Sequence, residues 1–350
     1  MPKLHEMFEA SEITVDGYID MAYTRLSGAG TFTSGVANRV FDTERNAFLL
    51  HQAAITFAKQ PKEGFGGLVN LTAGKDADVI ASFDANPGAT QKFDITQAFL
   101  HYGGGPLMVI AGKFVTTAGA EVIKSTANVN YSRSILFGYA IPFTHTGVRA
   151  NYSLSDNFTL VAGLNNGWDN LRETNPQKTA ELGVLLSPIK DLSLSVMSHV
   201  GSERVGGLTL AGPEGRRSLI DVVATYALTE KLSLTLNYDN ARERNAATVA
   251  PSGAETAKWS GIAAYVTYQM SPTWRLALRG ETFDDDDGYR TGVAQTWEEA
   301  TLTLAYLPSK SLELRGEVRA DRSDAASFLK TDGTAGKSQN SFALQALYKF

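Results

Sequence analysis

Arginine and glutamate side chains that could act chemically recur on alternate residues of several segments. The clearest sets are Arg275, Arg279 and Glu281, followed by Glu313, Arg315, Glu317 and Arg319. In an extended chain, alternate residues point to the same face, so each segment would present one charged face. Such faces could line a water-filled space and sort solutes by charge. For any single residue, a solvated wall of salt-bridged side chains explains the pattern equally well.

A catalytic interpretation has less support in the sequence. His51, His101, His145 and His199 lie in separate segments, and no motif connects any of them to a nucleophile. The chain has no Cys, which excludes disulfides and thiolate metal sites. The acidic run 284–287 lacks the spacing and the distal Glu of an EF-hand, so we interpret it as a solvated loop. We therefore expect no catalytic residues, no bound metal and no cofactor.

The elements that must position these charges are strands. Stretches of alternating apolar and polar residues, bounded by turn residues, predict about sixteen antiparallel strands, with about fourteen or eighteen left open. They cover residues 12–25, 47–59, 64–74, 92–102, 107–116, 143–154, 157–168, 177–187, 191–201, 216–228, 230–240, 257–269, 273–283, 295–306, 310–320 and 339–350. Segments of this length, apolar on one face, are typical of a transmembrane β-barrel.

The connections between these strands alternate strictly between short turns and long loops. The long ones cover residues 26–46, 75–91, 117–142, 169–176, 202–215, 241–256, 284–294 and 321–338. Short periplasmic turns, long extracellular loops and termini on the periplasmic side produce this alternation. Residues 76–83 could form a short helix in one long loop, with acids near its start, although ordinary loop structure is equally consistent.

Aromatic residues give a second test of this topology. A tyrosine stands near the end of six predicted strands that run towards the periplasm: Tyr102, Tyr152, Tyr226, Tyr268, Tyr306 and Tyr348. Aromatic residues favour the membrane interface, so we expect these six in one lipid-facing ring. The simpler alternative is that Tyr is common in strands. The terminal Phe350 resembles the signal by which outer-membrane proteins are recognised for insertion.

Composition agrees with a barrel. The 350 residues are 43% hydrophobic, yet no apolar run approaches the ~18 residues of a membrane helix. If the chain crosses a membrane, it must therefore do so as a closed β-barrel. We expect one domain over residues 1–350. A net charge of −5 argues against nucleic acid as a partner. Met1 to His5 lack the apolar core of a signal peptide, which indicates a mature form with a new initiator Met.

The loop at 117–142 is too apolar for full exposure to water. A barrel of this size leaves a water channel, so we expect the loop to fold inward and narrow it, with packing on a neighbouring subunit as the alternative. Residues expected at the pore wall or constriction are Lys113, Glu121, Lys124, Arg133, Arg149, Arg217, Arg275, Arg279, Arg315 and Arg319. At physiological salt a charge is screened beyond about 8 Å, so loop acids far from the constriction act weakly. Lys113, Arg149, Arg275, Arg279, Arg315 and Arg319 therefore predict a preference for anions, although interleaved glutamates could cancel them.

Several motifs resemble the OmpL-like family of β-barrel porins. They are Gly112-Lys113-Phe114, Asn130-Tyr131-Ser132-Arg133-Ser134, residues 142–149 and residues 163–169, supported by the opening at 15–20 and the final Phe. The resemblance implies a porin in the bacterial outer membrane, and it transfers no catalytic residue and no defined solute.

The function expected from the whole sequence is passive diffusion of small hydrophilic solutes or ions through a water-filled channel. The expected partners are outer-membrane lipid, lipopolysaccharide and the solutes, and a homotrimer is one assembly open to such a barrel. Two alternatives from other classes remain. An outer-membrane enzyme would need a clustered nucleophile and base. An adhesion or scaffold barrel would have a blocked lumen.

Overall fold

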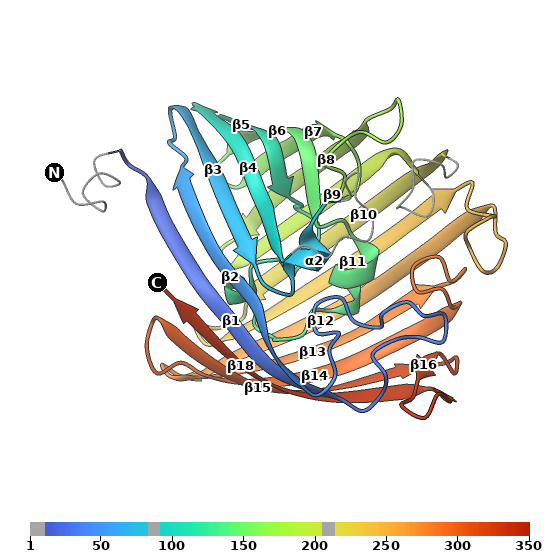
Figure 1. Ribbon diagram of the computed structural model, residues 1–350. Coiled ribbons are helices and arrows are strands. Elements are labelled where there is room, and N and C mark those ends of the chain that lie inside the picture. Colours follow the sequence, from blue (N-terminus) through green and yellow to red (C-terminus); the bar gives the residue numbers. More distant parts are fainter. Residues whose placement is uncertain (1–10, 83–91, 205–213) are drawn as a thin grey trace.

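The computed structural model describes residues 11–82, 92–204 and 214–350 of the chain. Within these residues, sixteen strands close into one antiparallel barrel in which β1 pairs with β18 (Figure 1). The predicted architecture and strand number are therefore confirmed. The barrel strands are β1 (Thr14–Leu26), β2 (Ala47–Lys59), β3 (Gly64–Ala73), β4 (Phe93–Gly104), β5 (Leu107–Val115), β6 (Thr144–Ser155), β7 (Phe158–Asn165), β8 (Thr179–Ile189), β9 (Leu192–Arg204), β10 (Glu214–Ala227), β11 (Leu232–Arg244), β12 (Thr256–Ser271), β13 (Trp274–Asp285), β14 (Gln295–Tyr306), β15 (Leu312–Ser323) and β18 (Ser338–Lys349).

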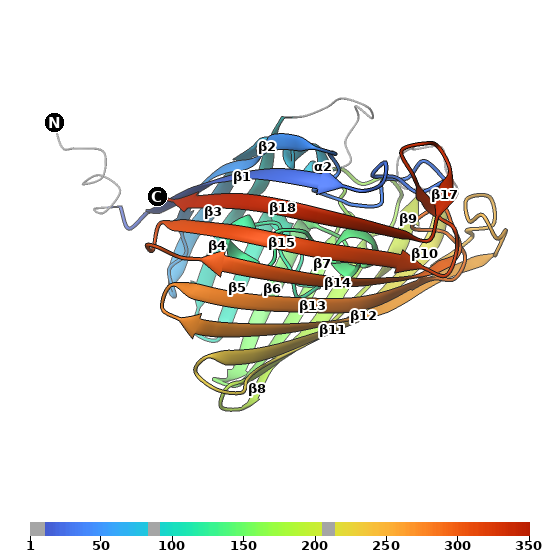
Figure 2. The same cartoon turned by 90° about the horizontal axis from the view of Figure 1, so that it is seen from below.

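The connections contain little regular structure. A short helix, α2 (Ala77–Ile80), forms within residues 76–83, for which the sequence was consistent with a helix or an ordinary loop. Phe83 lies outside the described residues. The loop between β5 and β6 contains a 3-10 turn, η1 (Ser125–Ala127), and a π turn, η2 (Leu136–Ala140). The last long loop forms a hairpin of β16 (Phe328–Leu329) and β17 (Ala335–Gly336), at the end of the barrel opposite the C-terminus (Figure 2).

Parts of the predicted loops at 75–91 and 202–215, and the predicted new start at Met1 to His5, lie outside the described residues. Among the residues that are described, no helix is both long enough and apolar enough to cross a membrane.

Alternation along β14 shows how the sequence sets the two faces. Glu299, Thr301 and Thr303 are buried towards the lumen, whereas Leu302 and Leu304 on the other face are exposed to 40% and 41%. Because successive side chains of a strand point to opposite faces, alternating polar and apolar residues place the polar ones towards the water-filled lumen and the apolar ones towards lipid. The pairing register between neighbouring strands keeps the same faces aligned around the barrel.

The six tyrosines are confirmed as outward-facing residues, with exposed fractions between 38% and 50%. Five stand beside a short turn, and Tyr348 stands near the C-terminal end of β18. Each pairs with a residue near the start or end of the adjacent strand, as Tyr306 does with Trp274 and Tyr102 with Phe65. The terminal Phe350 pairs with Gly17 through two backbone hydrogen bonds of 2.9 and 3.0 Å. A Cβ at Gly17 would lie 2.5 Å from the Phe350 ring, so a larger residue there would displace this ring.

Several strands continue past their predicted extracellular ends. β9, β11, β13 and β15 reach Arg204, Arg244, Asp285 and Ser323. Apolar–polar alternation marks only the part of a strand in lipid, whereas the backbone ladder continues wherever the neighbouring strand also extends. The sequence pattern therefore located the membrane-spanning part of each strand but predicted strands that are too short at their extracellular ends.

Candidate functional site: the lumen loop and its charged wall

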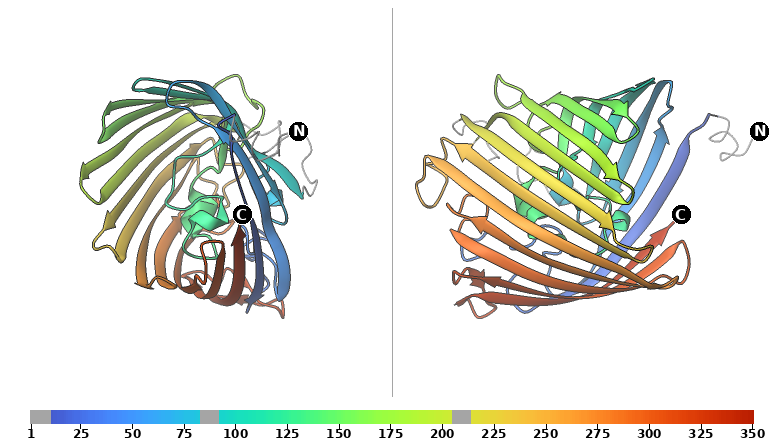
Figure 3. Two further views of the ribbon diagram at one scale, coloured as in Figure 1. Left: turned by 90° about the vertical axis from the view of Figure 1, so that its left-hand side faces the viewer. Right: turned by 180° about the vertical axis from the view of Figure 1, so that it is seen from behind.

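The long connection between β5 and β6 lies inside the barrel, as predicted. We call residues 117–142 the lumen loop. Its base is closed by a hydrogen bond of 2.9 Å from the Thr116 amide to the Phe143 carbonyl. The view along the barrel in Figure 3 shows it inside the ring of strands. Its residues contact wall side chains from β1, β2, β8 and β10 through β15.

Wall charges on β13 and β15 hold the lumen loop through its backbone. Glu281 accepts hydrogen bonds from the amides of Ile135 (2.7 Å) and Leu136 (3.1 Å). Glu317 accepts from the amides of Tyr131 (2.7 Å) and Ser132 (2.9 Å). An irregular buried segment must find partners for its backbone groups, and ionised side chains give the strongest such bonds.

Arginines on the same two strands satisfy the loop carbonyls. Arg319 donates to the Arg133 carbonyl (2.7 Å), and Arg315 donates to the Asn128 (2.7 Å) and Asn130 (3.1 Å) carbonyls. The alternating charged residues seen in the sequence therefore hold the lumen loop in place through its backbone, and we call this set of wall contacts the clamp. They act mainly on the loop and less as a charged surface facing water.

Arg279 is the centre of this clamp. Its guanidinium donates to Glu121 (2.8 Å) in the loop, to the Ser132 carbonyl (2.7 Å) and to Glu299 (2.7 Å) on β14. The Arg279 side chain is fully buried. Removing one partner of such a network leaves an uncompensated charge.

The opposite side of the lumen loop is anchored on the first two strands. Tyr131 shares its hydroxyl with Thr24 (2.6 Å) and His51 (3.0 Å), and His51 contacts Asp76 at 2.9 Å. Burial raises the pKa of the Tyr131 hydroxyl well above its usual value, so this anchor is a neutral phenol. In this arrangement His51 positions the loop.

The apolar side chains of the lumen loop pack against aromatic residues of the wall. Ile135, Leu136, Phe137, Tyr139 and Ile141 are buried in one cluster with Trp259, Phe283 and Trp297. The indole of Trp259 also donates to the Ala140 carbonyl at 3.1 Å. Burial of these apolar side chains favours a loop folded into the barrel over a loop exposed to water, as the sequence indicated.

A second loop, residues 27–46, also reaches the lumen loop, which the sequence interpretation missed. Arg39 pairs with Asp321 (2.7 Å) and Asp42 (2.8 Å). Phe41 lies 5.9 Å from Phe137 between ring centroids. Burial would raise the pKa of Asp42, but Arg39 and Arg319 hold it below its usual value. Val36, Val40 and Phe41 were the apolar signal that could have indicated this packing.

The predicted pore residues fall into three groups. The first group contacts or belongs to the lumen loop: Glu121, Arg133, Arg279, Arg315 and Arg319. The second group lies on the wall beside the loop and is paired there, Arg149 with Glu181, Arg217 with Glu243 and Arg275 with Glu313. The last two differ from expectation. Lys113 pairs with Asp94 (3.1 Å) away from the lumen loop, and Lys124, although it belongs to the loop, is half exposed and pairs with Asp16 (2.6 Å) on β1.

These pairs change the basis of the expected charge preference. Arg275, Arg279, Arg315 and Arg319 each contact a carboxylate within 4.0 Å. The interleaved glutamates therefore compensate the arginines locally, as the sequence allowed. The anion preference stays a prediction, and it no longer rests on free arginine charges.

The remaining histidines lie apart from any nucleophile among the described contacts. His145 and His199 are buried and stacked, with ring centroids 4.9 Å apart. Within the described residues, His, Cys, Asp and Glu form no group of three or more that could hold a metal ion.

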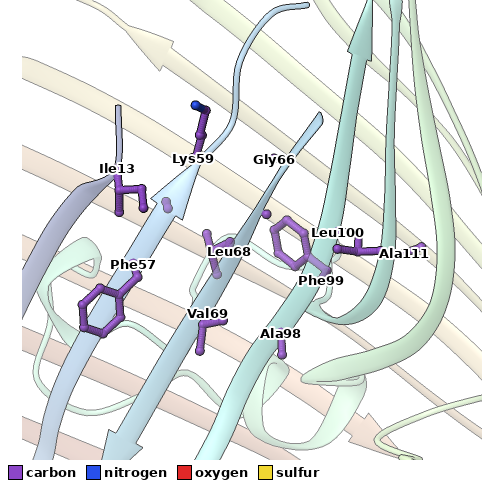
Figure 4. Close-up of a pocket in the computed structure, with 12 residues that line it drawn as sticks. Ile13, Phe57, Lys59, Gly66, Leu68, Val69, Ala98, Phe99, Leu100 and Ala111 are labelled. Carbon is purple, nitrogen blue, oxygen red and sulfur yellow. The ribbon is translucent and has the colours of Figure 1, made fainter. Parts of the chain in front are cut away.

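The outer surface of β2 to β5 carries a shallow apolar depression of about 580 Å³ (Figure 4). The floor of the depression consists of small outward-facing residues, Gly67, Ala98 and Ala111. Larger side chains such as Val69 and Leu100 occupy neighbouring outward-facing positions. This surface faces away from the lumen loop.

Comparisons with known proteins agree with this geometry. The sequence profile of the family described as "Putative beta-barrel porin-2, OmpL-like" matches residues 12–350. No curated protein sequence matches the chain significantly.

Solved structures give the same fold at low sequence identity. The outer-membrane channel DcaP of Acinetobacter baumannii is 14% identical, with 97% of each chain covered and a TM-score of 0.63. The trimer form of OmpT from Vibrio cholerae is 15% identical over 97% of this chain and 99% of that one, with a TM-score of 0.63. An anion-selective porin from Comamonas acidovorans is 12% identical over 97% and 99%, with a TM-score of 0.67. At such identities the likeness shows the fold alone.

Proposed function

The chain belongs to the family of OmpL-like β-barrel porins of the bacterial outer membrane, and on this premise we propose that small hydrophilic solutes and ions diffuse passively through its lumen. The observation that carries the proposal is the lumen loop clamped inside a sixteen-stranded barrel. A barrel of about this size is wide enough for water, and an inward loop narrows it to a size that can discriminate between solutes. We also propose that residues 1–350 form one domain.

We propose that Glu121, Arg133, Arg279, Arg315 and Arg319 border the narrowest part. Charges at a constriction act at close range on a passing ion, whereas exposed acids in the outer loops are screened. Arg149, Arg217 and Arg275 line the wall beside it, and Lys113 and Lys124 have smaller roles because they face other partners.

The enzyme alternative has little support in the geometry. His51 uses its two ring nitrogens to hold Tyr131 and Asp76, which is a positional role. The scaffold alternative differs from a channel in one measurable property, the passage of ions.

The purified, refolded protein is expected to insert into planar lipid bilayers and give discrete current steps in KCl. Liposomes containing it should also swell faster with a pentose than with a trisaccharide, because a narrowed lumen discriminates by size. The folded state is checked by heat-dependent electrophoretic mobility. A folded barrel that carries no current and admits no pentose would contradict the porin proposal and favour a scaffold.

We also propose that the chain assembles as a homotrimer through the depression on β2 to β5. One of the similar folds, OmpT, was solved in a trimer form, and an apolar depression with a floor of small residues favours close packing in lipid. Replacing Ala98 with Trp is expected to fill the depression and shift native mass spectra from trimer to monomer. Ala264→Trp on β12, on a distant part of the outer face, is the matched control. A wild-type monomer, or a trimer unaffected by Ala98→Trp, would contradict this assembly.

A further inference from the structure

A cavity of about 360 Å³ opens between the end of the lumen loop and the extracellular ends of the wall strands. Gly138, Ile141 and Phe143 form one side. The β7–β8 loop, the upper ends of β9 and β10, the β11–β12 loop and the β13–β14 loop supply the rest, including Trp168, Arg217, Tyr289 and Arg290. Cavities of about 300–1,000 Å³ are typical of small-molecule sites, so this one could hold a small organic molecule.

Aromatic rings and guanidinium groups are layered beside the cavity. Trp259 stacks on Tyr289 with centroids 5.6 Å apart, and Trp168 meets Trp259 edge-on at 6.3 Å. Arg217 lies 4.9 Å from the Trp168 ring, and Arg290 lies 5.3 Å from the Trp259 ring. Such rings offer a flat apolar surface with cations fixed beside it.

The charges around the cavity are unequally compensated. Arg217 pairs with Glu243, but Arg290 has no ion pair within 4.0 Å among the residues that the structure describes. The Arg290 Nε donates to the Tyr139 carbonyl at 2.5 Å, and this bond holds the guanidinium in place. Burial, together with the positive charge of Arg217, lowers the pKa of Arg290, although Tyr289, Asp285 and Asp169 act in the opposite direction.

The carboxylates that border the cavity are already engaged. Asp169 accepts hydrogen bonds of 2.8 Å from the amides of Phe143 and Thr144. Glu203 accepts from Thr179 (2.8 Å) and Asn170 (3.4 Å). Asp169 also has a φ of 57°, a left-handed conformation that Asp adopts more readily than most residues. These acids therefore organise the floor of the cavity.

We propose that this cavity binds a small organic carboxylate with a flat apolar body before it passes the lumen loop. The guanidinium of Arg290 takes the carboxylate, since a planar fork of donors matches two carboxylate oxygens. The apolar body lies along the aromatic side formed by Trp168 and Tyr289. The proposal rests on the proposed channel function, because it names the class of solute that the channel collects at its mouth.

Calorimetric titration of the folded protein in detergent tests the site without requiring transport. Benzoate is the probe, benzamide is its neutral equivalent, and acetate lacks the ring. We expect benzoate to bind at least about tenfold more tightly than either, because only benzoate offers both the charge and the ring. Arg290→Gln should weaken benzoate binding by about tenfold or more and leave the benzamide signal unchanged. Arg290→Lys, which keeps the charge, should lie between them.

Arg322→Gln is the matched control, because Arg322 is exposed near the extracellular end of β15 and lies outside the cavity. It should leave benzoate binding unchanged. Equal binding of benzoate and benzamide, tighter binding of benzylammonium, or an Arg290→Gln variant that binds benzoate as the wild type does would each overturn the proposal. Bilayer current is recorded on the same preparations. Normal current without benzoate binding rejects only this site, and absence of current rejects the channel.

Discussion

Deleting residues 120–140, with Gly119 joined to Ile141 through two glycines, is expected to raise single-channel conductance severalfold. The junction is short, because a Cβ at Gly119 would lie only 2.5 Å from the Ile141 side chain. The lumen loop lies in the lumen and is bound to β13 and β15. Removing it should return the lumen towards the open width of a barrel of this size.

The control for this deletion shortens an exposed segment outside the lumen. Removing residues 331–333 at the tip of the β16–β17 hairpin should leave conductance unchanged, because this tip is exposed. Both variants are checked for heat-dependent mobility before measurement. If a folded lumen-loop deletion conducts as the wild type does, the loop does not set the narrowest point.

The sequence predicted the barrel well because the responsible signal is local. Tyr306 and Phe350 mark an interface through their position relative to the nearest turn, and the alternation along β14 needs only a dozen neighbouring residues. The inward folding of the lumen loop was also predictable. Its apolar residues have no favourable place in water.

The pairing of charges could not be predicted in the same way. Glu121 and Arg279 are 158 residues apart in the chain, and Arg39 and Asp321 are 282 apart. Closing the barrel brings them together, and strand periodicity carries no information about a partner across the lumen. The cavity at Arg290 could not be predicted for the same reason, because its side chains come from several loops that are far apart in the sequence.

Replacing Arg279 with Gln is expected to destabilise the protein by about 3–5 kcal/mol, the range for breaking a buried ion pair. The side chain of Arg279 is 0% exposed, and its loss leaves Glu121, Glu281 and Glu299 with one cation fewer. The midpoint of thermal unfolding, followed by circular dichroism in detergent, should fall clearly. In a KCl gradient, the reversal potential should move towards cation selectivity, because the uncompensated carboxylates lie beside the lumen loop.

Arg275→Gln is the matched control on the same inward face of β13. Arg275 pairs with Glu313, its side chain is 16% exposed, and Glu313 keeps Arg315 as a second partner at 2.6 Å. Its replacement should therefore lower the unfolding midpoint less and shift the reversal potential less. If the two variants behave alike in both measurements, Arg279 is one wall charge among several and the clamp depends on the backbone contacts of Glu281 and Glu317. A larger effect at Arg279 in both would instead tie stability and ion selection to the same buried guanidinium.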